Sequence, residues 1–139
     1  MSFPDNCLKG ISVEDQLLQD GYIASHLFYF NKQSDRDDDW CEQSINWDDD
    51  EHAIDFTLNQ KKDGKIQFRI GVAILPRDEL DQINKRPTVN GILSYERKIL
   101  KENKYHGNIL IKNNVEVKKR KQIAAIIALS VARIIQCTN

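Results

Sequence analysis

A pair of alternating segments, one on each side of Lys62-Asp63-Gly64, constrains the fold more than any other part of the chain. Apolar and polar residues alternate over 54–58 and again over 66–74, which is the period of a β-strand with one buried face. A three-residue loop ending in a left-handed glycine joins such strands into a hairpin. This register pairs Lys61 with Lys65 and puts the apolar residues of both segments on one face. The sequence therefore predicts a β-hairpin here.

Other segments carry further strand and helix patterns. The last of them, 115–136, has no Gly or Pro and distributes Ile, Ala and Leu around its circumference, so we expect a long and largely buried helix. For 22–30 we expect a strand, with a continuation of the preceding helix as the alternative. The remaining expectations are helices over 12–20 and 77–83 and strands over 41–47, 92–100 and 105–112.

The order of these segments predicts the fold class. Strands that follow one another through short loops pair antiparallel, and a long apolar helix can cover one side of the resulting sheet. A chain of 139 residues suits one domain. We therefore predict a single α+β domain over 1–139, with a mainly antiparallel sheet, a long, largely buried C-terminal helix and one or two short helices. Within it, 31–51 is an acidic loop or an irregular strand region, and we favour a short strand over Cys41–Trp47.

The cysteines and the apolar segments indicate where the protein resides. Cys7, Cys41 and Cys137 are odd in number, and no two have the C-x-x-C spacing of a zinc or redox site. The N-terminus lacks the basic and apolar regions of a signal peptide. The longest apolar run, Ile123–Ile135, is shorter than the roughly 20 residues that span a bilayer. We expect a cytoplasmic protein with reduced thiols and no membrane contact.

Charge separates along the chain after Gln60. Residues 1–60 carry 14 Asp and Glu against three Lys and Arg, a net charge of −11. Residues 61–139 carry 17 Lys and Arg against seven Asp and Glu, a net charge of +10. Because summed charge steers association and does not select a fold, this asymmetry bears on the partners of the protein.

No pattern in the sequence predicts a catalytic site, a metal site or a cofactor. Consecutive acids such as Asp48–Glu51 point alternately to opposite sides of an extended chain and do not converge on one cation. Asp55 lacks the acid-x-Lys partner that a metal-dependent nuclease would place on the next strand. No motif surrounds His26, His52 or His106, although a Cys–His pair can form in space. The sequence leaves an enzyme open but favours a non-enzymatic protein.

An acidic, tryptophan-containing segment is the strongest candidate for a binding surface. Trp is enriched among the residues that dominate binding energy at interfaces, and charge complementarity selects a basic partner. We expect a small macromolecule-binding protein, of the immunity, inhibitor or adaptor type, that docks this surface on a basic protein. The expected partner-binding residues are Asp37, Asp38, Asp39, Trp40, Trp47, Asp48, Asp49, Asp50 and Glu51.

A basic cluster at the start of the C-terminal helix carries the alternative. Lys118, Lys119, Arg120 and Lys121 lie where the helix dipole also attracts anions. They predict a phosphate- or nucleic-acid-binding module, although the overall charge of −1 is unlike that of a dedicated nucleic-acid binder. Self-association, with the acidic half of one copy on the basic half of another, is a third expectation.

Overall fold

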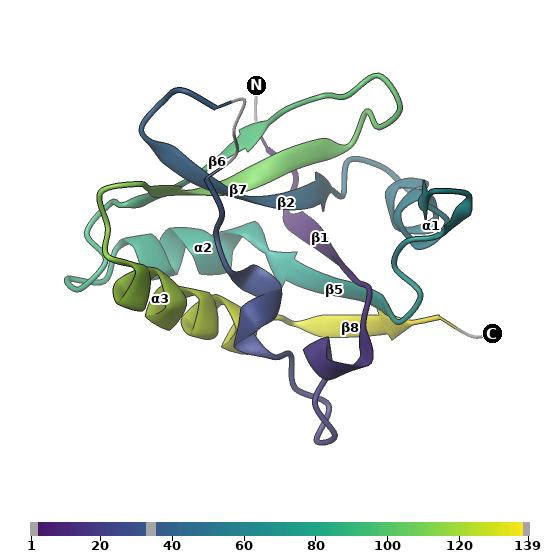
Figure 1. The fold of residues 1–139 in the computed structure, drawn as a ribbon, viewed down its shortest axis with the longest axis horizontal. Helices are drawn as coiled ribbons and strands as arrows, with labels where there is room; N and C mark the ends of the chain where they lie inside the picture. Colours follow the sequence, from purple (N-terminus) through teal and green to yellow (C-terminus); the bar gives the residue numbers. More distant parts are fainter. Residues whose placement is uncertain (1–2, 33–35, 138–139) are drawn as a thin grey trace.

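Six antiparallel strands make up the main sheet of this computed structural model, which describes residues 3–32 and 36–137 (Figure 1). Their order across the sheet is β6-β7-β2-β1-β5-β8. A small hairpin, β3–β4, and three α-helices complete the described part of the fold, which confirms the predicted single α+β domain. The strands of the sheet are β1 (Asn6–Ile11), β2 (Trp40–Trp47), β5 (Gly71–Pro76), β6 (Leu93–Arg97), β7 (His106–Lys112) and β8 (Arg133–Gln136).

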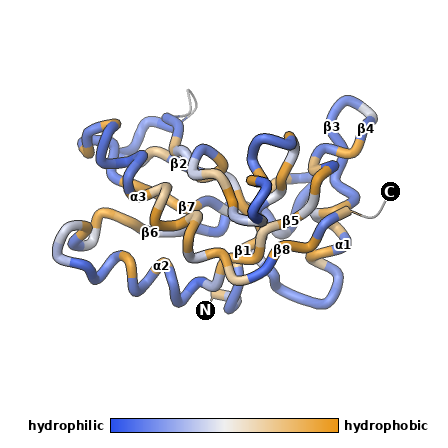
Figure 2. Tube along the Cα trace, turned by 90° about the horizontal axis from the view of Figure 1, so that it is seen from below, coloured by the Kyte–Doolittle hydropathy of each residue, from blue (hydrophilic) through white to orange (hydrophobic). Residues whose placement is uncertain are grey.

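One face of the sheet is apolar and carries the main core. Side chains of β1, β2, β5 and β7 on this face, such as Cys7 and Ile109, are buried. Helices α2 (Arg77–Asn84) and α3 (Val117–Leu129) pack against it, together with the 3-10 turn η2 (Ser25–Phe28). In Figure 2 the hydrophobic colouring follows the central strands, whereas hairpin β3–β4 is mostly hydrophilic. The core therefore lies between the sheet and these three helical segments.

The opposite face of the sheet is polar over much of its area. Helix α1 (Ala53–Leu58) covers one end and forms a second, smaller core with residues such as Leu8. Farther along, β2 and β7 present Glu42, Asn46 and Asn108, whose exposed fractions are 6 %, 5 % and 0 %. Buried polar groups are stable only with hydrogen-bond partners, so polar contacts organise this face.

The predicted hairpin between 54–58 and 66–74 is wrong in its first strand, because this part of the chain forms helix α1. Ala53 and Thr57 lie one helical turn apart and are both buried, and Thr57 Oγ1 donates to the Ala53 carbonyl oxygen at 2.8 Å. A strand would have placed these two residues with Asp55 on the solvent face. The short segment fits both periods, and burial of the Ala53 side favours the helix.

The turn itself lies where the sequence predicts it, but it is one residue tighter. Strand β3 (Lys61–Lys62) pairs with β4 (Lys65–Ile66), which leaves two residues in the loop. These residues, Asp63 and Gly64, have φ angles of 54° and 78°, as a type I′ turn requires. After this hairpin the chain loops back, and the longer strand β5 begins only at Gly71.

The expected helix over 12–20 and the expected strand over 22–30 are both wrong. The first is a single 3-10 turn, η1 (Glu14–Gln16), in which Gln16 Oε1 accepts a hydrogen bond from the backbone N–H of Ser12 at 2.9 Å. The second contains η2, whose apolar side chains reach the main core beside α3. Tertiary packing has overridden the local preference in both segments.

The C-terminal helix is shorter than the predicted 115–136. Helix α3 ends at Leu129, and β8 follows as an edge strand beside β5. The segment after Leu129 is rich in β-branched residues, which suit a strand. Gly71 permits the pairing, because a Cβ there would lie 2.2 Å from the carbonyl oxygen of Ile135.

Strands β2, β6 and β7 and helix α2 agree with the sequence predictions, and Pro76 is the N-cap of α2 as expected. Strand β1 was missed, because its short pattern is interrupted by Lys9 and Gly10. Within the described ranges, no helix is long and apolar enough to cross a membrane.

Candidate functional site

The acidic residues predicted to form one surface lie in two groups at opposite ends of β2. Asp37–Asp39 come directly before this strand and Asp48–Glu51 directly after it. Eight residues in extended conformation span roughly 25 Å, so this strand keeps the two groups apart. Figure 1 shows the chain leaving β2 at its two ends. Residues 33–35 of the predicted acidic segment lie outside the described residues. A single continuous acidic surface is therefore not present in the described structure.

The group after β2 is engaged within the fold. Asp49 forms a bidentate ion pair with Arg97, at 2.7 and 2.8 Å. Asp50 accepts a hydrogen bond from the Tyr105 hydroxyl at 2.9 Å. Burial raises the pKa of Asp48, and the neighbouring Asp50 and Asp49 raise it further. These contacts hold the connection between β2 and α1, although Asp49, Asp50 and Glu51 are exposed and Asp48 is half-buried.

The two tryptophans have different roles. Trp47 is fully buried, and its Nε1 donates to the carbonyl oxygen of Glu96 at 3.1 Å. The prediction that Trp47 anchors a partner is wrong, because the ring belongs to the core with Phe3 and Tyr95 at centroid distances of 4.9 and 5.6 Å. Trp40 is only half-buried, which leaves it as the one predicted aromatic anchor that a partner can reach.

The group before β2 is exposed as well. Asp37 and Asp39 are exposed, and the backbone N–H of Asn113 donates to the Asp39 carbonyl oxygen at 2.8 Å. The ammonium of Lys112 lies 4.9 Å from the centroid of the Trp40 ring. We call residues Asp37–Trp40 the acidic strip.

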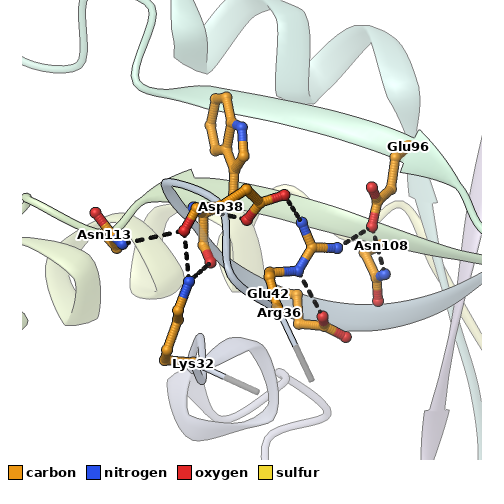
Figure 3. A network of polar contacts seen from close by, with 8 residues as sticks. Lys32, Arg36, Asp38, Glu42, Glu96, Asn108 and Asn113 are labelled. Atoms are coloured by element: carbon orange, nitrogen blue, oxygen red, sulfur yellow. Dashed lines mark hydrogen bonds and ion pairs between the residues drawn. The ribbon is translucent and has the colours of Figure 1, made fainter. Parts of the chain in front are cut away.

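Beneath the acidic strip lies a partly buried ionic network, which we call the Arg36 cluster: Arg36, Asp38, Glu42, Glu96 and Asn108 (Figure 3). The Arg36 side chain is only 6 % exposed. Its guanidinium donates to Glu42 and Asp38, each at 2.9 Å, and to Glu96. These carboxylates outweigh desolvation and raise the pKa of Arg36, so it stays charged. The cluster ties the loop before β2 to β6 and β7.

The basic cluster at the start of α3 is partly engaged and partly free. Arg120 Nη1 lies 3.2 Å from Cys41 Sγ, and the Lys121 ammonium lies 5.2 Å from the centroid of the Tyr29 ring. Lys118 and Lys119 are exposed. Because Cys41 follows the acidic strip directly, this contact places the start of α3 at the same end of β2 as the acidic strip.

A cleft that the sequence did not predict opens where β1 and β2 diverge. The two strands pair only at Cys7 with Trp47 and at Leu8 with Asn46. Beyond this point a cleft of about 860 Å³ is lined by both strands, by the end of α1 and by the loop between β6 and β7. We call it the Lys9 cleft, after the lysine of β1 that lines it.

Lys9 connects the two diverging strands. Its ammonium donates to the Ser44 carbonyl oxygen at 2.9 Å and to Gln43 Oε1. Burial lowers its pKa from 10.5 to about 8. The signal in the sequence is a lysine at an alternate position between Cys7 and Ile11, which point to the apolar face. Without knowledge that β1 is a central strand, that lysine reads as an ordinary surface residue.

A wall of amide side chains lines the cleft on the α1 side. Asn46 donates to Thr57 Oγ1 at 2.9 Å and to Gln60 Oε1 at 3.2 Å. Asn103 donates to Asn46 Oδ1 at 2.8 Å. The four side chains are those of Asn46, Gln60 and Asn103 and of Thr57, which contributes a hydroxyl. All but Gln60 are at most 5 % exposed, so the hydrogen bonds fix their positions. We call these residues the amide wall.

Chemical groups for other kinds of site do not come together in the described part of the chain. No three His, Cys, Asp or Glu side chains there are arranged to hold a metal ion. Cys7 and Cys41 are buried free thiols, and burial raises the pKa of Cys7 to about 12.

Comparisons of the chain with protein-family models, with curated proteins and with solved structures found no match.

Proposed function

We propose that this protein is a cytoplasmic, non-enzymatic protein-binding module that docks the acidic strip on a basic surface of a partner protein. An immunity-type inhibitor and an adaptor are the functional types that suit such a module. The proposal rests on one observation, the exposure of Asp37 and Asp39 beside the half-buried ring of Trp40. Trp47 and Asp48–Glu51 are not part of this narrower surface.

The acidic strip is held in place before any partner binds. Arg36 fixes Asp38 from below, and Asn113 fixes the backbone of Asp39. A preorganised surface loses less conformational entropy on binding. Opposite charges at an accessible surface mainly accelerate association, and salt weakens them. We therefore expect a basic partner whose binding decreases as ionic strength rises.

Neutralising the two exposed acids tests this proposal. In D37N/D39N, Asp38 and its contact with Arg36 remain, so we expect an unchanged fold and about tenfold weaker capture of basic proteins from a host lysate. The matched control is D78N/E79Q, which removes two exposed acids from α2. The measurement is quantitative mass spectrometry of captured proteins at low and high salt. Equal capture by D37N/D39N and the wild type would overturn the proposal.

The phosphate- or nucleic-acid-binding alternative keeps one supporting observation. Arg120 Nε is buried and has no hydrogen-bond partner among the described residues, and the exposed Lys118 and Lys119 precede it. Counterion release makes such binding fall steeply with salt. A salt-dependent gel shift that K118M/K119M abolishes and D37N/D39N retains would move the function to this basic cluster.

A further inference from the structure

The charge of Lys9 has no counter-ion among the described residues. An ammonium has three N–H donors, and the acceptors from Gln43 and Ser44 use two of them. Both acceptors are neutral. A half-buried charge without an opposite charge is unfavourable, and its lowered pKa of about 8 has burial as its cause. One donor and an uncompensated positive charge therefore remain inside the cleft.

The other ionisable groups that line the cleft do not supply this counter-ion. His26 faces Asp15 at 3.5 Å, and His106 Nδ1 contacts the Lys98 carbonyl oxygen at 2.9 Å. Lys61 adds a second positive charge. Glu102 is the one acid in the described lining, and it is exposed and forms no ion pair with Lys9 in the described residues.

The rest of the lining suits the body of a small polar molecule. Asn46 is held by hydrogen bonds to Thr57, Gln60 and Asn103. Gln60 uses its Oε1 to accept from Asn46, so within the described residues its two Nε2 donors are left for another acceptor. Phe68 adds an apolar surface against β1, because a Cβ on Gly10 would lie 2.1 Å from its ring. Mixed polar and apolar walls and a volume of several hundred Å³ are typical of small-molecule sites.

We infer that the Lys9 cleft binds a small organic anion, with its phosphate or carboxylate group on the Lys9 ammonium and its polar body along the amide wall. A lysine is a point charge that accepts either anion, so the charge and not the anion's geometry determines binding. This site shares no residue with the acidic strip and is independent of the proposed docking function.

NMR titration of the side-chain amides tests this inference directly. The probes are inorganic phosphate, a 5′-nucleoside monophosphate and succinate, each added up to about 10 mM, which is above the millimolar Kd of a weak specific ligand. We expect saturable shifts in the side-chain NH₂ signals of Asn46, Gln60 and Asn103. A response to both phosphate compounds identifies a phosphate site, and a response to succinate alone identifies a carboxylate site.

Three variants assign the response to the cleft. K9M removes the charge, and S44F fills the cleft from an exposed position on β2 while leaving the lysine in place; both should weaken binding at least tenfold. K85M removes an exposed lysine at the end of α2 and should bind as the wild type does. Thermal unfolding verifies that each variant is folded. The absence of any saturable shift, or shifts that persist unchanged in K9M and S44F, would overturn the inference.

Discussion

Replacing Arg36 by methionine is expected to lower the free energy of unfolding by about 3–5 kcal/mol, the effect typical of a buried charge that loses its partner. Arg36 is the only positively charged member of the Arg36 cluster, and it neutralises Glu42, whose side chain is 7 % exposed. Without the guanidinium, the buried Glu42 carboxylate loses the partner that compensates its burial. Urea denaturation at pH 7 measures the effect.

Two further measurements distinguish the loss of this ion pair from a simple loss of packing. Removing the orphaned charge in R36M/E42Q should recover part of the lost stability. The pKa of Asp38 is lowered by the Trp40 N–H and by Arg36, which outweigh desolvation. The contribution of this contact to the free energy of unfolding is therefore present above the unfolded-state pKa of Asp38 and is lost as pH falls through its folded-state pKa. The difference in stability between wild type and R36M should thus become smaller in acid. If R36M lowered the free energy of unfolding by less than about 1 kcal/mol, or if its difference from wild type grew in acid, the proposed role of Arg36 would be wrong.

Replacing Trp47 by alanine is expected to lower the free energy of unfolding by about 3–5 kcal/mol, the typical result for a large aromatic core residue. The ring is fully buried between Phe3 and Tyr95, and its N–H is satisfied by Glu96. W47F keeps an aromatic ring and should be less destabilising. Urea denaturation of both variants measures the effect.

The matched control is W40A, which changes a half-buried ring at the start of the same strand. It should change stability by about 1 kcal/mol or less, as substitutions away from the core usually do, while weakening any docking at the acidic strip. If W47A were as stable as W40A, Trp47 would not be a core residue, and the prediction from the sequence that it anchors a partner would again be supported.

The sequence predicted those elements whose patterns fit only one period. Strands β6 and β7 and helix α2 have clear boundaries, and Pro76 can only begin a helix such as α2 or end a strand such as β5. The predictions for residues 53–58 and for the segment after Leu129 were wrong because short apolar runs fit a helix and a strand equally well. In both cases the choice depends on distant contacts: α1 packs on the second core, and β8 pairs with β5.

The candidate sites were harder to predict than the fold. Runs of acidic residues are visible in the sequence itself, which is why the residues of the acidic strip were predicted. Whether Asp49 is free or bound to Arg97 depends on a contact across 48 residues. The Lys9 cleft was missed for the same reason, because nothing local marks β1 as a central strand that diverges from β2. A lysine that is unremarkable in sequence becomes distinctive only once its neighbours are known.

The claim that most depends on this structure is that the Lys9 ammonium lies half-buried without a counter-ion. Its pKa tests that claim, and it can be measured by following the side-chain ¹³Cε signal of Lys9 as pH is raised. We expect a pKa of about 8, against 10.5 for an ordinary lysine. Because the unfolded chain then binds more protons between these values, the stability of the wild type relative to K9M should rise with pH over the same interval. Titration of Lys9 near 10.5 would contradict the account, since it would show an ammonium surrounded by water or paired with a carboxylate.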